Sequence, residues 1–210
     1  MNVNETGDSL ASLYDQLADT YAAGRHRFDT TPILERLAQR LPTGARLLDV
    51  GCGAGEPTAC YFLNQGCAVV GIDLSERMLT LARQRAPEAD FRRMDMRQLD
   101  FPAESFDAIT AVYSVFHLPR ADHQALFAGF ARVLQPGGVL LLTLATREYS
   151  GHDEFDGEVE FLGRRLPYSH DRPEAALNKL RAAGFAILDD RLLAIGGETF
   201  YWVIAGKSGV

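Results

Sequence analysis

The chain has few of the features that set special protein classes apart from ordinary globular ones. Its 210 residues include only three cysteines, Cys52, Cys60 and Cys67, and no C-x-x-C pair, which argues against a disulfide framework or a zinc ribbon. The longest apolar run, residues 139–145, is far shorter than the roughly 18 residues that a membrane helix needs. The opening segment is acidic and polar, unlike a signal peptide. We therefore expect a cytoplasmic protein with no membrane partner.

Basic charge is also scarce. The sequence has 21 Lys and Arg against 28 Asp and Glu, a formal net charge of −7. Its densest basic stretch, Arg92-Arg93 with Arg97, is interspersed with acids, whereas a nucleic-acid surface needs concentrated positive charge. The histidines lack metal-ligand spacing, so no metal site is predicted. We expect a small-molecule substrate, no nucleic acid, and a monomer or homodimer.

Short apolar runs alternate with amphipathic helical segments along most of the chain. This order predicts an α/β fold with βαβ units: a doubly wound, mostly parallel, Rossmann-like sheet. Near the end two runs follow one another around Gly196-Gly197, which predicts a terminal antiparallel pair and a seven-stranded sheet. The predicted strands cover residues 46–50, 68–72, 89–94, 106–112, 139–144, 185–193 and 199–205. The predicted helices cover about residues 10–21, 32–41, 57–64, 75–85, 122–134 and 173–183.

We predict one domain over residues 1–210, with N-terminal capping helices at 8–41 and a core at 45–206. Residues 147–171 carry seven acids and three arginines without a clean period. Because long loops in compact domains are usually functional or disordered, we expect a substrate lid here, over the carboxyl ends of the fourth and fifth strands. Phe161 and Tyr168 should lie near the substrate, and the acids could favour a cationic one. The alternative is a solvated acidic face.

A glycine-rich loop follows the first strand. Gly51, Gly53 and Gly55 allow a tight turn and the close approach of a ligand to the backbone, next to a helix N-terminus. A dinucleotide-binding loop, G-x-G-x-x-G, would place a glycine at position 56, which is Glu56 here. A carboxylate at this point would oppose a pyrophosphate, so the spacing disfavours NAD. A tight turn without a ligand remains the alternative reading.

Two acids follow the next two strands. Asp73 ends the second strand, where a carboxylate can accept both hydroxyls of a ribose, and Asp95 ends the third, where it can meet an adenine amino group. Ligands of open α/β sheets bind at the carboxyl ends of the strands. The glycine loop and the two acids together suit an adenosine without phosphates.

These segments resemble the motifs of class I S-adenosylmethionine-dependent methyltransferases. Residues 47–55 resemble the first motif of this family, and residues 71–75 resemble its second motif. Asp95-Met96 matches the position that binds adenine, and residues 134–138 resemble the turn before the fifth strand. The terminal antiparallel pair is also similar, and residues 14–21 resemble a helix that caps the cofactor in the small-molecule branch. The resemblance covers roughly residues 10–206.

The resemblance implies S-adenosylmethionine as cofactor and a role for each matching residue. The glycine loop packs the methionine moiety, Asp49 orders that loop, Asp73 holds the ribose and the Ala111 carbonyl receives the ammonium. The implied cofactor-binding residues are Tyr14, Tyr21, Asp49, Gly51, Cys52, Gly53, Gly55, Asp73, Leu74, Asp95, Met96 and Ala111. Asp49 could instead only cap the loop, and Met96 and one of the tyrosines could be core residues.

Methyl transfer from a sulfonium is an in-line displacement that mainly requires alignment, and a base is needed only when the acceptor must lose a proton. Tyr113 could orient an acceptor, while His117 and His170 are candidate proton acceptors. His117 could instead anchor the next helix, and His170 could lie next to a helix cap. The tetrad of nucleic-acid amino-methyltransferases and the Pro-Cys of cytosine C5 enzymes are absent from residues 112–119.

The sequence therefore predicts an S-adenosylmethionine-dependent methyltransferase that acts on an O, N or S atom of a small molecule. Two alternatives remain open: a protein or tRNA methyltransferase, and a non-catalytic S-adenosylmethionine-binding regulator. An NAD-dependent reductase is disfavoured by Glu56 and by the terminal strand pair.

Overall fold

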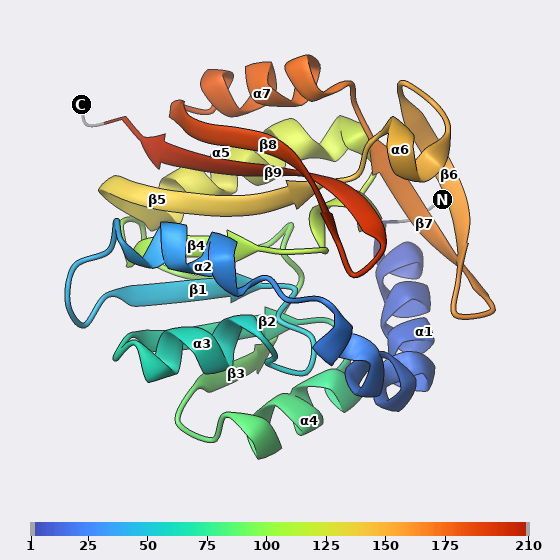
Figure 1. Cartoon of the computed structure of the whole chain (residues 1–210), viewed down its shortest axis with the longest axis horizontal. Coiled ribbons are helices and arrows are strands. Elements are labelled where there is room, and N and C mark those ends of the chain that lie inside the picture. The colour runs from blue at the N-terminus through green and yellow to red at the C-terminus, as the bar shows by residue number, and fades with distance from the viewer. Residues whose placement is uncertain (1–2, 209–210) are drawn as a thin grey trace.

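A seven-stranded sheet with the strand order β3-β2-β1-β4-β5-β9-β8 forms the centre of the molecule (Figure 1). The computed structural model describes residues 3–208, and the side chains of all of these except residues 3–9 and 26. The first five strands are parallel, and β9 is antiparallel to both β5 and β8. The predicted seven-stranded, mostly parallel sheet with an antiparallel pair at its end is confirmed.

The elements follow the alternation of the sequence with small shifts at their ends. Helix α2, for example, ends at Ala38 rather than at Leu41. Ser75 caps α4 as expected, because its Oγ accepts a hydrogen bond from the backbone N–H of Met78. The helices are α1 (Val3–Gly24), α2 (Thr31–Ala38), α3 (Thr58–Asn64), α4 (Glu76–Arg85), α5 (His123–Val133), α6 (Arg147–Ser150) and α7 (Pro173–Ala182), with 3₁₀ turns η1 (Arg25–Arg27), η2 (Val115–His117) and η3 (Arg120–Asp122). The strands are β1 (Arg46–Val50), β2 (Ala68–Asp73), β3 (Asp90–Arg93), β4 (Phe106–Ala111), β5 (Leu134–Leu144), β6 (Phe155–Phe161), β7 (Arg164–His170), β8 (Phe185–Ile195) and β9 (Glu198–Lys207).

Each face of the sheet packs against its own layer of helices. Alternate residues of a strand point to opposite faces, so Leu140 and Leu142 of β5 join one apolar cluster while Leu141 joins the other. The first cluster includes buried side chains of α5 and α7, and the second includes those of α2, α3 and α4. Because both faces are covered, the parallel strands read as continuous apolar runs in the sequence.

Two elements cover the edge of the sheet at which the parallel strands end. Helix α1 and the two-stranded sheet of β6 and β7 lie there side by side, at the right of Figure 1. The turn between β8 and β9 reaches the same edge. Apolar contacts of Ala18 and Ala22 with Ala54 and Met78 hold α1 against the glycine loop and α4. This edge is where a ligand of an open α/β sheet binds.

The segment 147–171, for which the sequence shows no period, forms a short helix and a β-hairpin. Strands β6 and β7 pair in antiparallel register from Phe155↔His170 to Phe161↔Arg164. Strand β6 is largely exposed, while Leu166, Tyr168 and His170 of β7 are buried. The expected loop is therefore an ordered hairpin docked on the carboxyl edge of the sheet.

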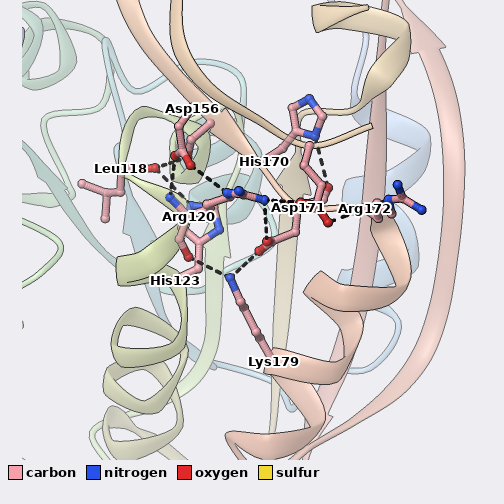
Figure 2. Close-up of polar contacts among 10 residues, drawn as sticks. Leu118, Arg120, His123, Asp156, His170, Asp171, Arg172 and Lys179 are labelled. Carbon is pink, nitrogen blue, oxygen red and sulfur yellow. Dashed lines mark hydrogen bonds and ion pairs between the residues drawn. The ribbon is translucent and has the colours of Figure 1, made fainter. Parts of the chain in front are cut away.

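A network of ion pairs fixes the base of this hairpin (Figure 2). The Arg120 guanidinium lies 2.7 Å from both Glu154 Oε2 and Asp156 Oδ2, and Lys179 of α7 pairs with Asp171. Asp153 pairs with Arg147 and Arg172 in the same way. Asp153, Glu154 and Asp156 of this segment thus pair with neighbouring arginines, and the expectation that the acids favour a cationic substrate stays a prediction.

Candidate active site

The glycine loop is built as the sequence predicts. The backbone N–H groups of Gly51 and Cys52 both donate to the carbonyl of Ile72, which draws the loop onto the end of β2. Gly51 has a φ of 71°, and a Cβ there would lie 2.4 Å from the Cβ of Ser114. Gly53 also has a positive φ, 52°, but a Cβ there would meet only Tyr21, at 3.9 Å. Gly51 is therefore required for packing, whereas Gly53 faces open space.

Asp73 lies directly beside this open space. Its Oδ2 accepts a hydrogen bond from the N–H of Gly53 (2.9 Å), and its Oδ1 accepts one from the N–H of Ser75 (2.9 Å). Burial raises the pKa of this carboxyl, and the backbone N–H groups of Ser75 and Gly53 oppose that shift. Each carboxylate oxygen keeps a second acceptor position. The carboxylate is thus held in place, with capacity for two further hydroxyl donors.

A cleft runs from the glycine loop past Asp73 to the end of β3. Eight of the twelve residues implied by the resemblance line this cleft: Tyr14, Tyr21, Gly51, Gly53, Asp73, Leu74, Asp95 and Met96. Asp95, at the far end, is bound by the Arg97 guanidinium of its own loop. The cleft therefore presents a glycine loop at one end, one carboxylate in the middle and another at the far end.

The other four residues lie behind the wall of the cleft. Asp49 is buried and accepts a hydrogen bond from Thr110 Oγ1 at 2.7 Å, and its burial raises its pKa to about 7. Cys52 and Ala111 are buried in the two apolar clusters. Gly55 packs against α4 and β3, because a Cβ there would lie 3.3 Å from Ala82 and 3.4 Å from Phe91. These residues support the loop from behind.

Helix α1 closes the cleft and is held by polar contacts with the start of α4. Asp15 Oδ1 accepts hydrogen bonds from Ser75 Oγ and from the N–H of Arg77. Asp19 forms an ion pair with the Arg77 side chain at 2.7 Å. These contacts place Tyr14 and Tyr21 over the glycine loop.

A second cavity adjoins the cleft. Tyr14, Tyr21 and Tyr113 line both spaces. The walls of the second cavity are mostly aromatic, with Phe28, Phe116, Phe161, Tyr168 and Phe200. Phe161 and Tyr168 of the hairpin lie in this wall, whereas the hairpin acids do not line it. Arg25, Arg27 and Glu198 are its charged residues.

Tyr113 stands between the two spaces in an uncommon backbone conformation. Its φ is 57°, and its N–H donates to Thr143 Oγ1 at 2.6 Å. A non-glycine residue held at positive φ costs free energy and is typical of functional sites. Its buried hydroxyl has no hydrogen-bond partner within the described part of the chain, and burial raises its pKa. The role of Tyr113 in orienting an acceptor stays a prediction.

His117 lines the cleft, but both of its ring nitrogens are engaged. Nε2 lies 2.7 Å from the Tyr14 hydroxyl, and Nδ1 lies 2.9 Å from the carbonyl oxygen of Pro167. Because a carbonyl only accepts, Nδ1 carries the proton and Tyr14 donates to Nε2. Burial lowers the pKa of His117 to about 4. The histidine thereby connects helix α1 with hairpin strand β7.

His170 lies outside both spaces, at the base of the hairpin (Figure 2). Its Nε2 is 2.6 Å from Ser150 Oγ, and its Nδ1 is 3.1 Å from the Asp171 carbonyl oxygen. The structure thus places His170 beside the start of helix α7, as the sequence predicts.

The sequence reading missed several lining residues. Arg25, Glu198 and Phe200 of the second cavity come from η1 and β9. The glycine loop and the aspartates that follow strands identify the cleft from the sequence. No local pattern identifies the cavity residues, because they come together only when distant segments of the chain pack. Within the range that the structure covers, no cluster of three or more His, Cys, Asp or Glu could hold a metal ion. No described helix is both long and apolar enough to span a lipid bilayer.

Comparisons with known proteins agree with this geometry. Residues 48–142 match the family model described as a methyltransferase domain. The 27-O-demethylrifamycin SV methyltransferase of Amycolatopsis mediterranei is 40% identical over 66% of this chain and 57% of its own length. The ubiquinone/menaquinone biosynthesis C-methyltransferase of Methylobacterium nodulans is 30% identical over 92% of this chain and 86% of its own. The alignments cover less than two thirds of the first curated relatives, 57%, 60% and 64% of the first three.

A solved structure with a similar fold is that of a Burkholderia thailandensis 1,6-didemethyltoxoflavin-N1-methyltransferase, with bound 1,6-didemethyltoxoflavin and S-adenosylhomocysteine. Its TM-score to this chain is 0.79 at 21% identity, and the match covers 99% of this chain and 91% of that one. At this identity the likeness concerns the fold alone.

Proposed function

Because the chain belongs to the class I S-adenosylmethionine-dependent methyltransferases, we propose that it transfers a methyl group to an O, N or S atom of a small molecule. The observation that carries the proposal is the pair of adjoining spaces, which share Tyr14, Tyr21 and Tyr113. One is a cleft at the glycine loop that contains the carboxylates of Asp73 and Asp95, and the other is an aromatic cavity beside it. A methyl donor in the first and an acceptor in the second would meet at the three tyrosines.

S-adenosylmethionine is the methyl donor of this family, as the sequence motifs predict. The open space beside Gly53 and the fixed carboxylate of Asp73 fit its methionine and ribose parts. Leu74 and Met96 give the cleft apolar walls, and Asp95 lies at its far end. When bound, the cofactor supplies an activated methyl group on a sulfonium.

The residues of this chain would align the reactants and exclude water. Helix α1 lines the cleft and the β6–β7 hairpin lines the cavity, so both elements would shield the reactants from solvent. Tyr113, with an unpartnered hydroxyl between the two spaces, is the residue we assign to acceptor orientation. His117 would fix Tyr14 and the hairpin, since its ring nitrogens are already bonded.

The aromatic lining of the cavity favours a small acceptor over a protein or tRNA. Its lining comes from α1, η1, β7 and β9, which surround it on several sides. The relatives and the structural neighbour reported above act, by their names, on rifamycin, quinone and toxoflavin precursors. Their names support a small acceptor, although one of them is a C-methyltransferase.

Turnover of a candidate-acceptor panel, followed by release of S-adenosylhomocysteine, tests the proposal. The panel includes small phenols, amines, thiols and carbon acids, together with a protein and a tRNA mixture. Gly53→Val is the matched control, because its side chain would fill the open space at the loop. We expect methylation of a small compound by the wild type and none by the variant. Methylation of only the protein or the tRNA would contradict a small-molecule acceptor.

A further inference from the structure

Arg25 occupies an unusual position in the wall of the aromatic cavity. Its guanidinium carbon lies 4.6 Å from the ring centroid of Tyr113, 5.2 Å from that of Phe28 and 5.7 Å from that of Tyr21. All three distances are within the range of cation–π contacts. The rings therefore hold the cation at the cavity wall from three directions.

This charge is in direct contact with no carboxylate of the described residues, although Arg25 is near enough to Glu198 of the same cavity to lower the pKa of that carboxyl. Among the side chains that the structure describes, none forms an ion pair or a hydrogen bond with the Arg25 guanidinium. Most other arginines of the chain are ion-paired, for example Arg36 with Asp189 and Arg97 with Asp95. Contact with ring faces stabilises a cation but does not neutralise it or satisfy its N–H donors. The cavity thus contains a permanently charged group with donors to spare.

We propose that Arg25 recognises the acceptor, and that the acceptor is a planar aromatic compound with an anionic oxygen, a carboxylate or an ionised phenol. This inference rests on the proposed function, because it concerns the acceptor cavity. Phe116, Tyr168 and Phe200 stack on one another in the cavity wall, and together they give the aromatic part an apolar surface to contact. The guanidinium offers paired N–H donors for the oxygen anion.

A cationic acceptor is disfavoured by the same geometry. The three rings that could surround a cation already surround Arg25, which would repel a second positive charge. Glu198 is the cavity's only acid within the described lining, and it has no ion pair. Burial raises the pKa of Glu198, and the nearby charge of Arg25 opposes that shift. An anchoring role toward the cofactor is disfavoured because Arg25 lines the cavity and not the cleft.

Calorimetry with three matched naphthalene probes tests the inference on the full chain saturated with S-adenosylhomocysteine. The probes are 1-hydroxy-2-naphthoate, its neutral methyl ester and the cation 1-naphthylmethylammonium. We expect the naphthoate to bind at least about tenfold more tightly than the ester, as a charge-assisted pair would allow. We expect the ammonium to bind more weakly than either. Equal binding of acid and ester, or tighter binding of the ammonium, would overturn the inference.

Three variants assign the effect to its residue. Arg25→Gln should remove the preference for the naphthoate over the ester and change the affinity for S-adenosylhomocysteine by less than about twofold. Arg40→Gln removes the same charge from an exposed position two residues after the end of α2, and it should keep the preference for the naphthoate over the ester. Glu198→Gln should strengthen naphthoate binding, because it removes a like charge.

The outcomes separate this inference from the proposed function. If Arg25→Gln weakens S-adenosylhomocysteine and keeps the naphthoate preference, Arg25 serves the cofactor and the inference is wrong. If the wild type does not bind S-adenosylhomocysteine, the proposed function fails. The same probe series on the protein alone then still decides the role of Arg25.

Discussion

His117 shows how burial changes what a single residue of the site can do. The sequence makes it a candidate base, but its two ring nitrogens are bonded to Tyr14 and to the Pro167 carbonyl. Protonation would place a second proton on Nε2, which accepts the Tyr14 hydrogen bond, and would charge a buried ring. The neutral form is therefore part of the folded structure, and the residue has a measurable signature in the dependence of stability on pH.

We expect His117→Asn to lose less of its stability in acid than the wild type. The folded pKa of about 4 lies below the unfolded value near 6.5, so the unfolded state binds the proton first. The contribution of neutral His117 is thus fully present above about pH 6.5 and is lost as the pH falls toward 4. From pH 7.5 to pH 5 the gap in the free energy of unfolding between wild type and variant should narrow by about 2 kcal/mol.

Urea unfolding at the two pH values measures this gap. A comparison with the variant is needed because Asp49 acts in the opposite direction. Its folded pKa of about 7 is raised from 3.8, so its contribution is present at low pH and is lost as the pH rises through 7. His152→Asn, at an exposed histidine, is the matched control and should follow the wild type. A gap for His117→Asn that stays constant would show that the ring does not titrate as its burial implies.

Among the elements, helix α1 depends on few contacts for its place over the cleft. We expect Asp15→Ala to lower the free energy of unfolding by about 1–2 kcal/mol, because it leaves Ser75 Oγ and the Arg77 N–H without their acceptor. Affinity for S-adenosylhomocysteine, measured by calorimetry, should fall several-fold as the helix loosens. Asp19→Ala is the control, since its ion pair is exposed and should contribute less than about 0.5 kcal/mol. Equal effects of the two variants would mean that α1 is not held by Asp15.

The elements that the sequence predicts well are those with strong local signals. The strands of the main sheet are buried on both faces and read as apolar runs, and glycines and acids mark their ends. The β6–β7 hairpin was not predicted, although the acids Asp156, Glu158 and Glu160 of β6 alternate with apolar residues or glycine, as in a half-buried strand. Its turn places Leu162 at a φ of 50°, a conformation for which asparagine or glycine is the usual indication. The acceptor cavity had no local signal, since η1, β7 and β9 meet there only in the folded chain.

On the scale of the whole molecule, strand order decides where the site lies. Strand β1 has β2 on one side and β4 on the other, so the chain reverses its direction of winding at the end of β1. The crevice outside such a reversal is the usual ligand site of doubly wound sheets. The glycine loop lies at this point, and α1 and the hairpin close over it from outside the sheet. A ligand there would contact the sheet, α1 and the start of α4 together.

A ligand that bridges these elements should therefore stabilise the whole fold. At a concentration 100 times its dissociation constant, S-adenosylhomocysteine should add about 2.7 kcal/mol to the free energy of unfolding. This corresponds to a rise of roughly 5–10 °C in the unfolding midpoint of a domain of this size. NAD should cause no rise, because Glu56 stands where its pyrophosphate loop needs a glycine. Asp73→Ala, which removes the carboxylate assigned to the ribose, should weaken binding by about 1–3 kcal/mol and reduce the rise accordingly. Thermal unfolding monitored by calorimetry measures all three, and a rise with NAD but not with S-adenosylhomocysteine would refute the assignment of the cleft.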